Sequence, residues 1–169
     1  MSEIGIFFGS SSGKTEKVAL RIRKLIGEER TGIGDIAESS VRDLLPFRSL
    51  ILGVPTWGIG ELQEDWADFL PGLGGFDLGG RKVALFGLGD QESYPDSFAN
   101  ALGTLYDSLL TKGCEITGSF PVEGYRFVKS TAVREGRFGG LVLDEENQSH
   151  LTDKRLNAWL EGILPELLA

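Results

Sequence analysis

The sequence predicts an α/β fold, a three-layer, doubly wound sheet of five parallel strands with helices on both faces. Apolar runs of strand length alternate with amphipathic segments of helix length along the chain. Such strands are buried on both faces of a sheet, and right-handed crossovers join them in parallel. No linker, repeat or low-complexity segment divides the 169 residues, so we expect a single domain over residues 1–169.

The first half of the chain supplies three of the expected strands and two helices. Short apolar runs predict strands at 3–8, 31–36 and 47–55, the last stopped by Pro55. Periodic apolar residues predict helices at 14–27, closing on Gly27, and at 62–70. The residues expected to face the core are Val18, Ile22, Leu25 and Ile26 in the first helix and Trp66, Phe69 and Leu70 in the second.

The second half completes the alternation. Strands are expected at 81–87, 114–120 and 140–144, and helices at 95–113 and 151–168. The polar stretch 121–139 interrupts what would be the last strand, and a loop that long is usually functional or a peripheral insertion. The inward residues are expected to be Phe98, Leu102, Leu105 and Leu109, then Leu156, Trp159, Leu160, Ile163 and Leu164.

Composition excludes several classes of protein. The chain is 41% hydrophobic and 25% charged, with no apolar run of about 18 residues and no basic region before its first apolar stretch. We therefore expect a cytoplasmic globular protein. One cysteine and one histidine leave no disulfide and no Cys/His metal site, so Cys114 is expected to be a packing residue. The net charge of −8 argues against nucleic acids and anionic membranes; it leaves solubility alone or docking to basic proteins.

The loop "FFGSSSGKT" at 7–15 leaves the first strand and enters a helix. It is not a nucleoside triphosphate loop, because that spacing puts the first glycine five residues before Gly13, where Phe8 stands. The hydroxyls and backbone N–H groups at the helix N-terminus still predict an anion site for a phosphate. The alternative is a serine-rich turn in which Ser12 only caps the helix.

Two further glycine-rich loops follow later strands, "PTWGIGELQ" at 55–63 and "GLGDQESYPDSF" at 87–98. Each carries one aromatic residue, Trp57 and Tyr94, which either packs locally or offers a stacking surface. In a parallel sheet all three loops leave the carboxyl ends of their strands, where doubly wound folds bind ligands. A phosphate site beside two aromatic rings is typical of a site for a planar, phosphorylated ring.

These motifs resemble those of the long-chain flavodoxins over essentially the whole chain. "SSSGKT" is similar to the family's phosphate loop, the other two loops to its isoalloxazine loops, and "GLVLDEENQSHLTDKRLNAW" to its C-terminal signature. The insertion at 121–139 lies where long-chain members split their fifth strand. The resemblance implies the strand order 2-1-3-4-5 and an FMN cofactor, bound where the first and third strands diverge.

The resemblance also implies roles for individual residues. Trp57 and Tyr94 would sandwich the flavin, with Tyr94 nearly coplanar, and the Gly58 carbonyl would accept a hydrogen bond from flavin N5–H unless Gly58 only completes a turn. The remaining implied contacts are Ser10, Ser11, Ser12, Gly13, Lys14 and Thr15 around the phosphate, Pro55, Thr56, Ile59, Gly60, Leu88, Gly89 and Asp90 along the ring and ribityl chain, and Phe98 and Glu146 nearby.

The implied function is low-potential, one-electron transfer by a monomer, not an enzyme with its own substrate. Partners would be basic redox proteins in transient complexes: a flavodoxin reductase or pyruvate oxidoreductase-type donor and an acceptor, with "VALFGLGD" and "SYPDSF" favouring the nitrogenase iron protein. The alternative is a flavodoxin-like NAD(P)H:quinone reductase. Carboxylates expected on the flavin side would steer partners and disfavour reduction: Glu61, Glu64, Asp65, Asp68, Asp90, Glu92, Asp96, Asp144, Glu145 and Glu146.

Overall fold

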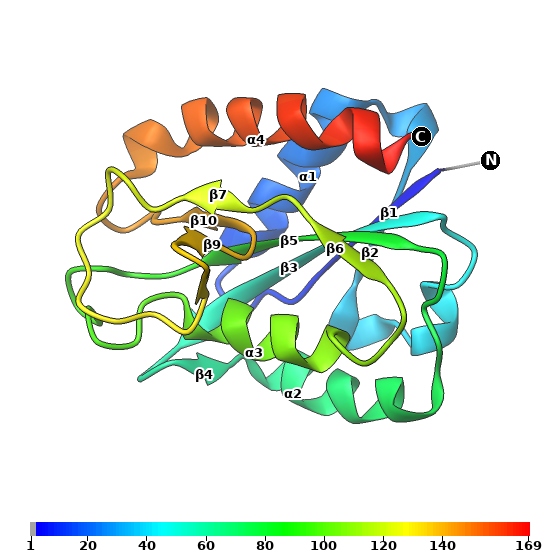
Figure 1. Ribbon diagram of the computed structural model, residues 1–169, viewed down its shortest axis with the longest axis horizontal. Coiled ribbons are helices and arrows are strands. Elements are labelled where there is room, and N and C mark those ends of the chain that lie inside the picture. The colour runs from blue at the N-terminus through cyan, green and yellow to red at the C-terminus, as the bar shows by residue number, and fades with distance from the viewer. Residues whose placement is uncertain (1–2) are drawn as a thin grey trace.

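The computed structural model describes residues 3–169, and its centre is a mostly parallel sheet (Figure 1). The main strands lie in the order β10-β5-β3-β1-β2, with every neighbouring pair parallel. Their bounds are Ile4–Phe8 for β1, Thr31–Asp35 for β2, Ser49–Trp57 for β3, Lys82–Leu88 for β5 and Leu141–Leu143 for β10. The predicted fold class and strand order are therefore confirmed.

The fifth strand position of the sheet is filled by two separate pieces. β6 (Glu115–Thr117) pairs with the first half of β5, and β10 pairs with the second half. The chain between them forms a small antiparallel sheet in the order β7-β9-β8. These strands are Phe120–Pro121, Val133–Arg134 and Arg137–Phe138 for β7, β8 and β9. The insertion is thus where it was predicted, but 114–120 is not one continuous strand.

Helices cover both faces of the sheet, which gives three layers (Figure 1). α1 (Lys14–Ile26) and α4 (Thr152–Leu167) lie on one face, and α2 (Glu64–Phe69) and α3 (Asn100–Leu109) lie on the other. Short 3₁₀ turns occur at Glu28–Arg30, Ile36–Glu38, Val41–Asp43, Leu70–Gly75 and Ser149–Leu151. No helix within residues 3–169 is both long and apolar enough to cross a bilayer.

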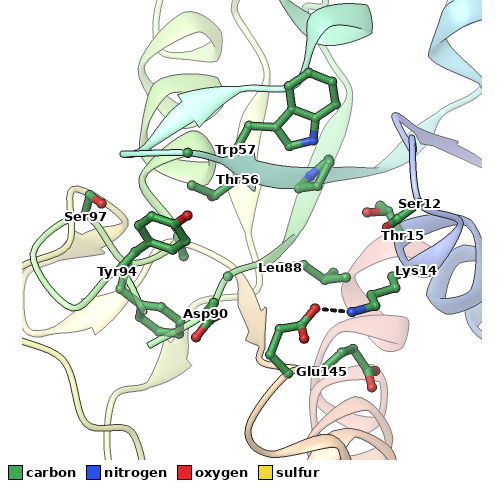
Figure 2. Close-up of a pocket in the computed structure, with 16 residues that line it drawn as sticks. Ser12, Lys14, Thr15, Thr56, Trp57, Leu88, Asp90, Tyr94, Ser97 and Glu145 are labelled. Carbon is green, nitrogen blue, oxygen red and sulfur yellow. Dashed lines mark hydrogen bonds and ion pairs between the residues drawn. The ribbon is translucent and has the colours of Figure 1, made fainter. Parts of the chain in front are cut away.

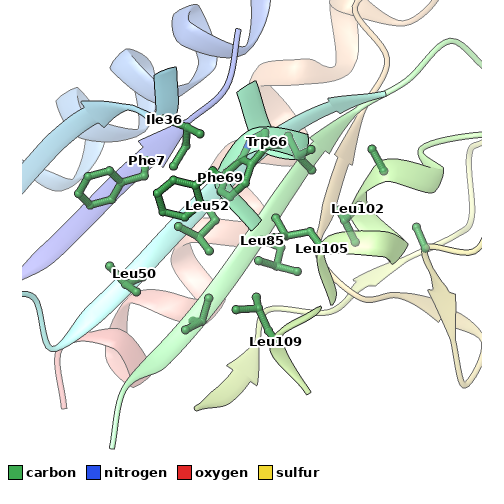
Figure 3. Packing of buried hydrophobic residues seen from close by; sticks show 14 of the residues in the cluster. Phe7, Ile36, Leu50, Leu52, Trp66, Phe69, Leu85, Leu102, Leu105 and Leu109 are labelled. Atoms are coloured by element: carbon green, nitrogen blue, oxygen red, sulfur yellow. The ribbon is translucent and has the colours of Figure 1, made fainter. Parts of the chain in front are cut away.

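Successive strand residues point to opposite faces, so the sheet divides the core into two clusters. Figure 3 shows the cluster under α2 and α3, where Phe7, Leu52 and Leu85 meet Trp66 and Leu102. Cys114 packs against the edge of this cluster, and burial raises the pKa of its thiol. The second cluster includes Ile4, Ile6, Ile22, Ile51, Phe86 and Trp159 beneath α1 and α4.

The prediction that Pro55 stops the third strand was wrong, because β3 continues to Trp57. The carbonyl of Gly53 faces β1 and accepts from Gly9 N at 3.1 Å. Pro55, two residues on, faces the same side, but the β1 ladder has already ended at the pair of Phe8 and Gly53. A proline is tolerated there because no ladder hydrogen bond requires its missing N–H.

The helix predicted at 95–113 is much shorter, since α3 begins at Asn100 and ends at Leu109. Ala99 has φ 53°, a left-handed conformation that interrupts any helix through 95–99. Phe98 is fully buried as expected, but in a turn and not on the helix. Among the other expected core residues, Leu25 is 49% exposed, and Ile26, Leu70 and Leu164 are only half-buried.

Candidate functional site

The three predicted loops meet at the carboxyl edge of the sheet and enclose a cleft of about 210 Å³. Figure 2 shows Ser12, Lys14 and Thr15 at one end of this cleft and Tyr94 at the other, with Trp57 at the end of β3. The lining residues are Ser12, Lys14, Thr15, Pro55, Thr56, Trp57, Gly58, Leu88, Gly89, Asp90, Tyr94, Ser97, Phe98, Ala99, Glu145 and Glu146.

The loop before α1 presents several unused hydrogen-bond donors. Within residues 3–169, the backbone N–H groups of Ser10, Ser11 and Ser12 make no hydrogen bond. Gly13 adopts φ 90° at the N-cap, and its own N–H donates to Ser10 Oγ at 3.1 Å. Free N–H groups at the positive end of a helix bind anions, so this loop fits a phosphate.

Lys14 begins the helix after the loop, and its ammonium points toward Glu146, in the segment after β10. Its Nζ donates to Glu146 Oε1, and both side chains are about half exposed. The dashed line in Figure 2 marks this pair. The ion pair joins the phosphate loop to the segment after β10, and it agrees with an anion site that relies on backbone donors.

The second loop is a hairpin. β4 (Glu61–Leu62) folds back antiparallel onto β3, pairing Thr56 with Leu62 and Trp57 with Glu61. Trp57 at the end of β3 is 39% exposed, which is high for so large an aromatic ring. Gly58 adopts φ 46°, a conformation that favours glycine and makes the tight turn.

The third loop carries Tyr94, which is 41% exposed, above a packed base. The Phe98 ring lies 5.3 Å from the Phe127 ring and 6.1 Å from the Phe138 ring, both in the insertion. Hydrogen bonds join the same segments: the backbone N–H groups of 128 and 129 both donate to the Pro95 carbonyl. The insertion therefore supports the loop that presents Tyr94.

Asp144 follows β10 and is a fully buried carboxylate. Its oxygens accept hydrogen bonds from five nitrogens: the backbone N and Nε2 of Gln91, the backbone N of Glu146, and the backbone N and Nδ2 of Asn147. Gln91 in turn accepts from the backbone N of Arg126 in the insertion. Asp144 thus ties three segments together. It lies on the flavin side as expected, but because it is fully buried it does not belong to an exposed surface that could dock partners.

Asp90 lines the cleft next to this network. Burial raises the pKa of its carboxyl, but hydrogen bonds from Ser93, Asn147 and Glu92 together outweigh that effect, and the net shift is downward. Asn147 Nδ2 lies 2.8 Å from Asp90 Oδ1 and 2.9 Å from Asp144 Oδ2. One amide therefore bridges the cleft-lining carboxylate and the buried one.

Most of the predicted site residues lie in one place. Those that do not line the cleft are Ser10, Ser11, Gly13, Ile59 and Gly60; Ser10, Ser11 and Gly13 still belong to the phosphate loop, and Ile59 is 79% exposed. The prediction gave Glu145, a lining residue, only as a carboxylate on the flavin side, and it missed Ser97 and Ala99 in the lining and the buried amides Gln63 and Gln91 behind it. A glutamine inside a glycine-rich loop was the available signal for the last two. Within residues 3–169 no three His, Cys, Asp or Glu side chains gather as for a metal ion.

Comparison with known proteins gives a consistent result. A sequence model of one family, described as Flavodoxin, matches residues 6–159. The chain is 45% identical over 168 residues to a flavodoxin of Klebsiella pneumoniae and to Flavodoxin 1 of Escherichia coli K12, covering 99% of this chain and 96% of each relative. It is also 45% identical over 172 residues to Flavodoxin 1 of Azotobacter vinelandii, covering 99% of both chains.

Solved structures show the same likeness. The crystal structure of a Fusobacterium nucleatum flavodoxin bound to flavin mononucleotide superposes with a TM-score of 0.92 at 32% identity. The match covers 98% of this chain and 99% of that chain. The K13G mutant of a Fusobacterium nucleatum flavodoxin, also bound to flavin mononucleotide, gives 0.93 at 33% identity, covering 98% and 97%.

Proposed function

The chain belongs to the flavodoxin family, and we propose that it is a low-potential carrier of single electrons that binds FMN in the cleft between its three loops. One observation carries the proposal. The cleft is bordered by a loop at a helix N-terminus whose N–H groups have no partner within residues 3–169, and by two large, part-exposed aromatic side chains, Trp57 and Tyr94. These features suit a phosphate and a planar ring respectively.

The residues present account for each part of the cofactor. The loop at 10–15 would hold the phosphate, and Trp57 and Tyr94 would enclose the ring. Backbone groups of 56, 58 and 88–90 would meet its polar edge. Bound FMN supplies the redox chemistry, taking up and releasing electrons one at a time. The chain's part is to bind the ring, limit its contact with water and set the charge around it.

Flavin titration of the purified protein tests this function. We expect FMN to bind tightly with quenched fluorescence, and riboflavin to bind more weakly because it lacks the phosphate. Trp57→Ala and Tyr94→Ala should each weaken both flavins about two- to twelvefold, from roughly 0.5–1.5 kcal/mol per stacking contact. A protein that binds no FMN would contradict the proposal. So would NADPH oxidation by the protein alone, which indicates a quinone reductase.

Carboxylates around the cleft support the low potential. Each negative charge about 10 Å from the ring costs roughly 0.4–1.7 kcal/mol when a further negative charge is added there. For one electron this corresponds to roughly 20–70 mV. Of the carboxylates that the sequence predicts on the flavin side, those that are exposed or half-exposed are Glu61, Glu64, Asp65, Asp68, Asp90, Glu92, Asp96, Glu145 and Glu146.

The same carboxylates favour basic partner proteins in transient complexes, and we propose a flavodoxin reductase or a pyruvate oxidoreductase-type donor. The nitrogenase iron protein is our candidate acceptor, on sequence resemblance alone. The Escherichia coli and Azotobacter vinelandii relatives are both 45% identical to this chain, so overall identity does not favour either of them.

We expect the rate of reduction by a reductase to fall as salt is added. A rate that does not depend on ionic strength would contradict steering. We also propose a cytoplasmic monomer, which gel filtration tests for oligomeric state.

A further inference from the structure

Gln63 lies at the N-cap of α2, between the hairpin of the second loop and the phosphate loop. Its side chain is fully buried, although glutamine is mostly exposed in proteins. It does not line the cleft. A buried amide behind a binding loop needs a structural or functional reason, because buried polar groups are costly unless they are paired.

The amide nitrogen of Gln63 makes two hydrogen bonds. Nε2 donates to Asp65 Oδ2 at 2.5 Å and to Ser11 Oγ at 3.1 Å. Asp65 fixes this orientation, because an ionised carboxylate only accepts and must face the NH₂ end of the amide. The donor end of Gln63 is therefore the end that reaches the phosphate loop.

The carbonyl oxygen of the same amide is left without a partner. Within residues 3–169, Gln63 Oε1 is buried and accepts no hydrogen bond. It lies against Gly9 and Trp66, where a Cβ on residue 9 would overlap both side chains. The chain thus keeps a buried unpaired acceptor while both amide hydrogens are used to hold Asp65 and Ser11.

We propose that Gln63 is a positioning residue for the phosphate, acting through Ser11. Ser11 is exposed, and the N–H groups of Ser10, Ser11 and Ser12 bond to nothing else in the described chain. The hydrogen bond from Gln63 holds this stretch of backbone before a ligand arrives. Holding a loop in its bound conformation strengthens binding by reducing the entropy lost on association. The inference rests on the proposed function and assigns a specific determinant of its phosphate affinity.

Because Gln63 acts on the phosphate loop, its effect should separate two flavins. In Gln63→Met, which keeps the length of the side chain but has no amide, we expect FMN affinity to fall about tenfold and riboflavin affinity to change less than twofold. Both are measured by quenching of flavin fluorescence. Ser11→Ala should give the same pattern, and the double variant should lose no more FMN affinity than Ser11→Ala alone. Gln148→Met is the control, because the Gln148 amide donates to the Gly124 carbonyl away from the phosphate loop and does not line the cleft; this variant should bind both flavins as the wild type does.

Other outcomes are equally informative. Equal losses for FMN and riboflavin, no loss, or additive losses in the double variant would overturn the positioning role. If Gln63→Met does not fold, Gln63→Glu replaces the donor with an acceptor of the same size, and a selective loss of FMN is again expected. A wild-type protein that binds neither flavin would overturn the proposed function, and the role of Gln63 with it.

Discussion

The phosphate loop and the loop that carries Tyr94 lie at the same edge of the sheet but are built in opposite ways. In the phosphate loop, the backbone N–H groups of Ser10, Ser11 and Ser12 have no partner within residues 3–169. In the Tyr94 loop, Gln91 bonds through its backbone and side chain to Asp144 and to the insertion. One loop leaves donors free, and the other uses its polar groups internally.

This difference separates two tasks in binding one molecule. A phosphate is small and charged, and it can satisfy several N–H groups at once, so its loop needs free donors. A flat ring offers few hydrogen bonds, so its aromatic neighbours must be held by the protein. We therefore expect changes in the phosphate loop to affect FMN alone, and changes beneath the Tyr94 loop to affect FMN and riboflavin equally.

The largest effect is expected from Asp144→Ala. The change removes the acceptor of the backbone N–H and Nε2 of buried Gln91 and of the half-buried backbone N–H of Asn147, and leaving a buried donor unpaired costs about 1–3 kcal/mol. We expect the free energy of unfolding to fall by on the order of 3 kcal/mol in urea titrations of the apo-protein. FMN and riboflavin affinities should fall by the same factor. Asp144→Asn retains one acceptor oxygen, so its free energy of unfolding should fall less. A loss of affinity confined to FMN would contradict the expectation that this network supports the ring site.

Thr15→Val should give the opposite pattern. Thr15 is buried at the start of α1 and lines the cleft, and a hydrogen bond to a charged group contributes roughly 1.5–3 kcal/mol. FMN affinity should therefore fall about 10- to 150-fold while riboflavin affinity is retained. Thr104→Val on the exposed face of α3 is the matched control and should change neither affinity. Loss of riboflavin binding would show that Thr15 serves the whole cleft.

Gly58→Ala tests the tight turn between β3 and β4. An alanine at φ 46° costs about 1–2 kcal/mol, so the free energy of unfolding should fall by that amount. Gly74→Ala is the control, because Gly74 is not left-handed and has open space around its Cα. If the Gly58 carbonyl accepts from flavin N5–H, redox titration will also show a narrower gap between the two one-electron potentials. An unchanged gap would mean that Gly58 only completes the turn.

The smallest effect is a pH dependence at Asp90. The pKa of its carboxyl is lowered in the folded protein, so its contribution to stability is present above the unfolded value of about 3.9 and is lost as pH falls through the folded value. Urea midpoints of the wild type and Asp90→Asn should differ more at about pH 5.5 than at about pH 3, because the contribution of the charge is lost as the pH falls through the folded value. A difference that is the same at both pH values would show that hydrogen bonding alone, and not charge, matters at this position.

Much of this site could be predicted from local sequence. Buried strands, the helix after Gly13 and the aromatic residues Trp57 and Tyr94 are visible in short stretches, and a parallel sheet brings the loops together. The start of α3 could not be predicted this way. Residues 95–99 have the composition of a helix start, but Phe98 N bonds to the Lys129 carbonyl, 31 positions away in the chain. Long-range hydrogen bonds override local propensity there.

The burial of Gln63, Gln91 and Asp144 was missed for a related reason. Polar residues in loops usually face water, so nothing in the sequence indicates that these three are buried. Asp144 accepts hydrogen bonds from Gln91, 53 residues earlier, and Gln63 donates one to Ser11, 52 residues earlier. Neither pairing has a periodicity that a single sequence can show.

The divided fifth strand has a consequence for how the edge of the sheet opens. β10, beside the cleft, is fully buried, whereas β6 is exposed at Glu115 and half-buried after it. Each pairs with only three residues of β5, so one piece is able to separate while the other stays paired. Amide hydrogen exchange should therefore be fast in β6 and slow in β10. We therefore expect opening at this edge to be concentrated in β6, away from the cleft, while β10, which leads into Asp144, stays paired.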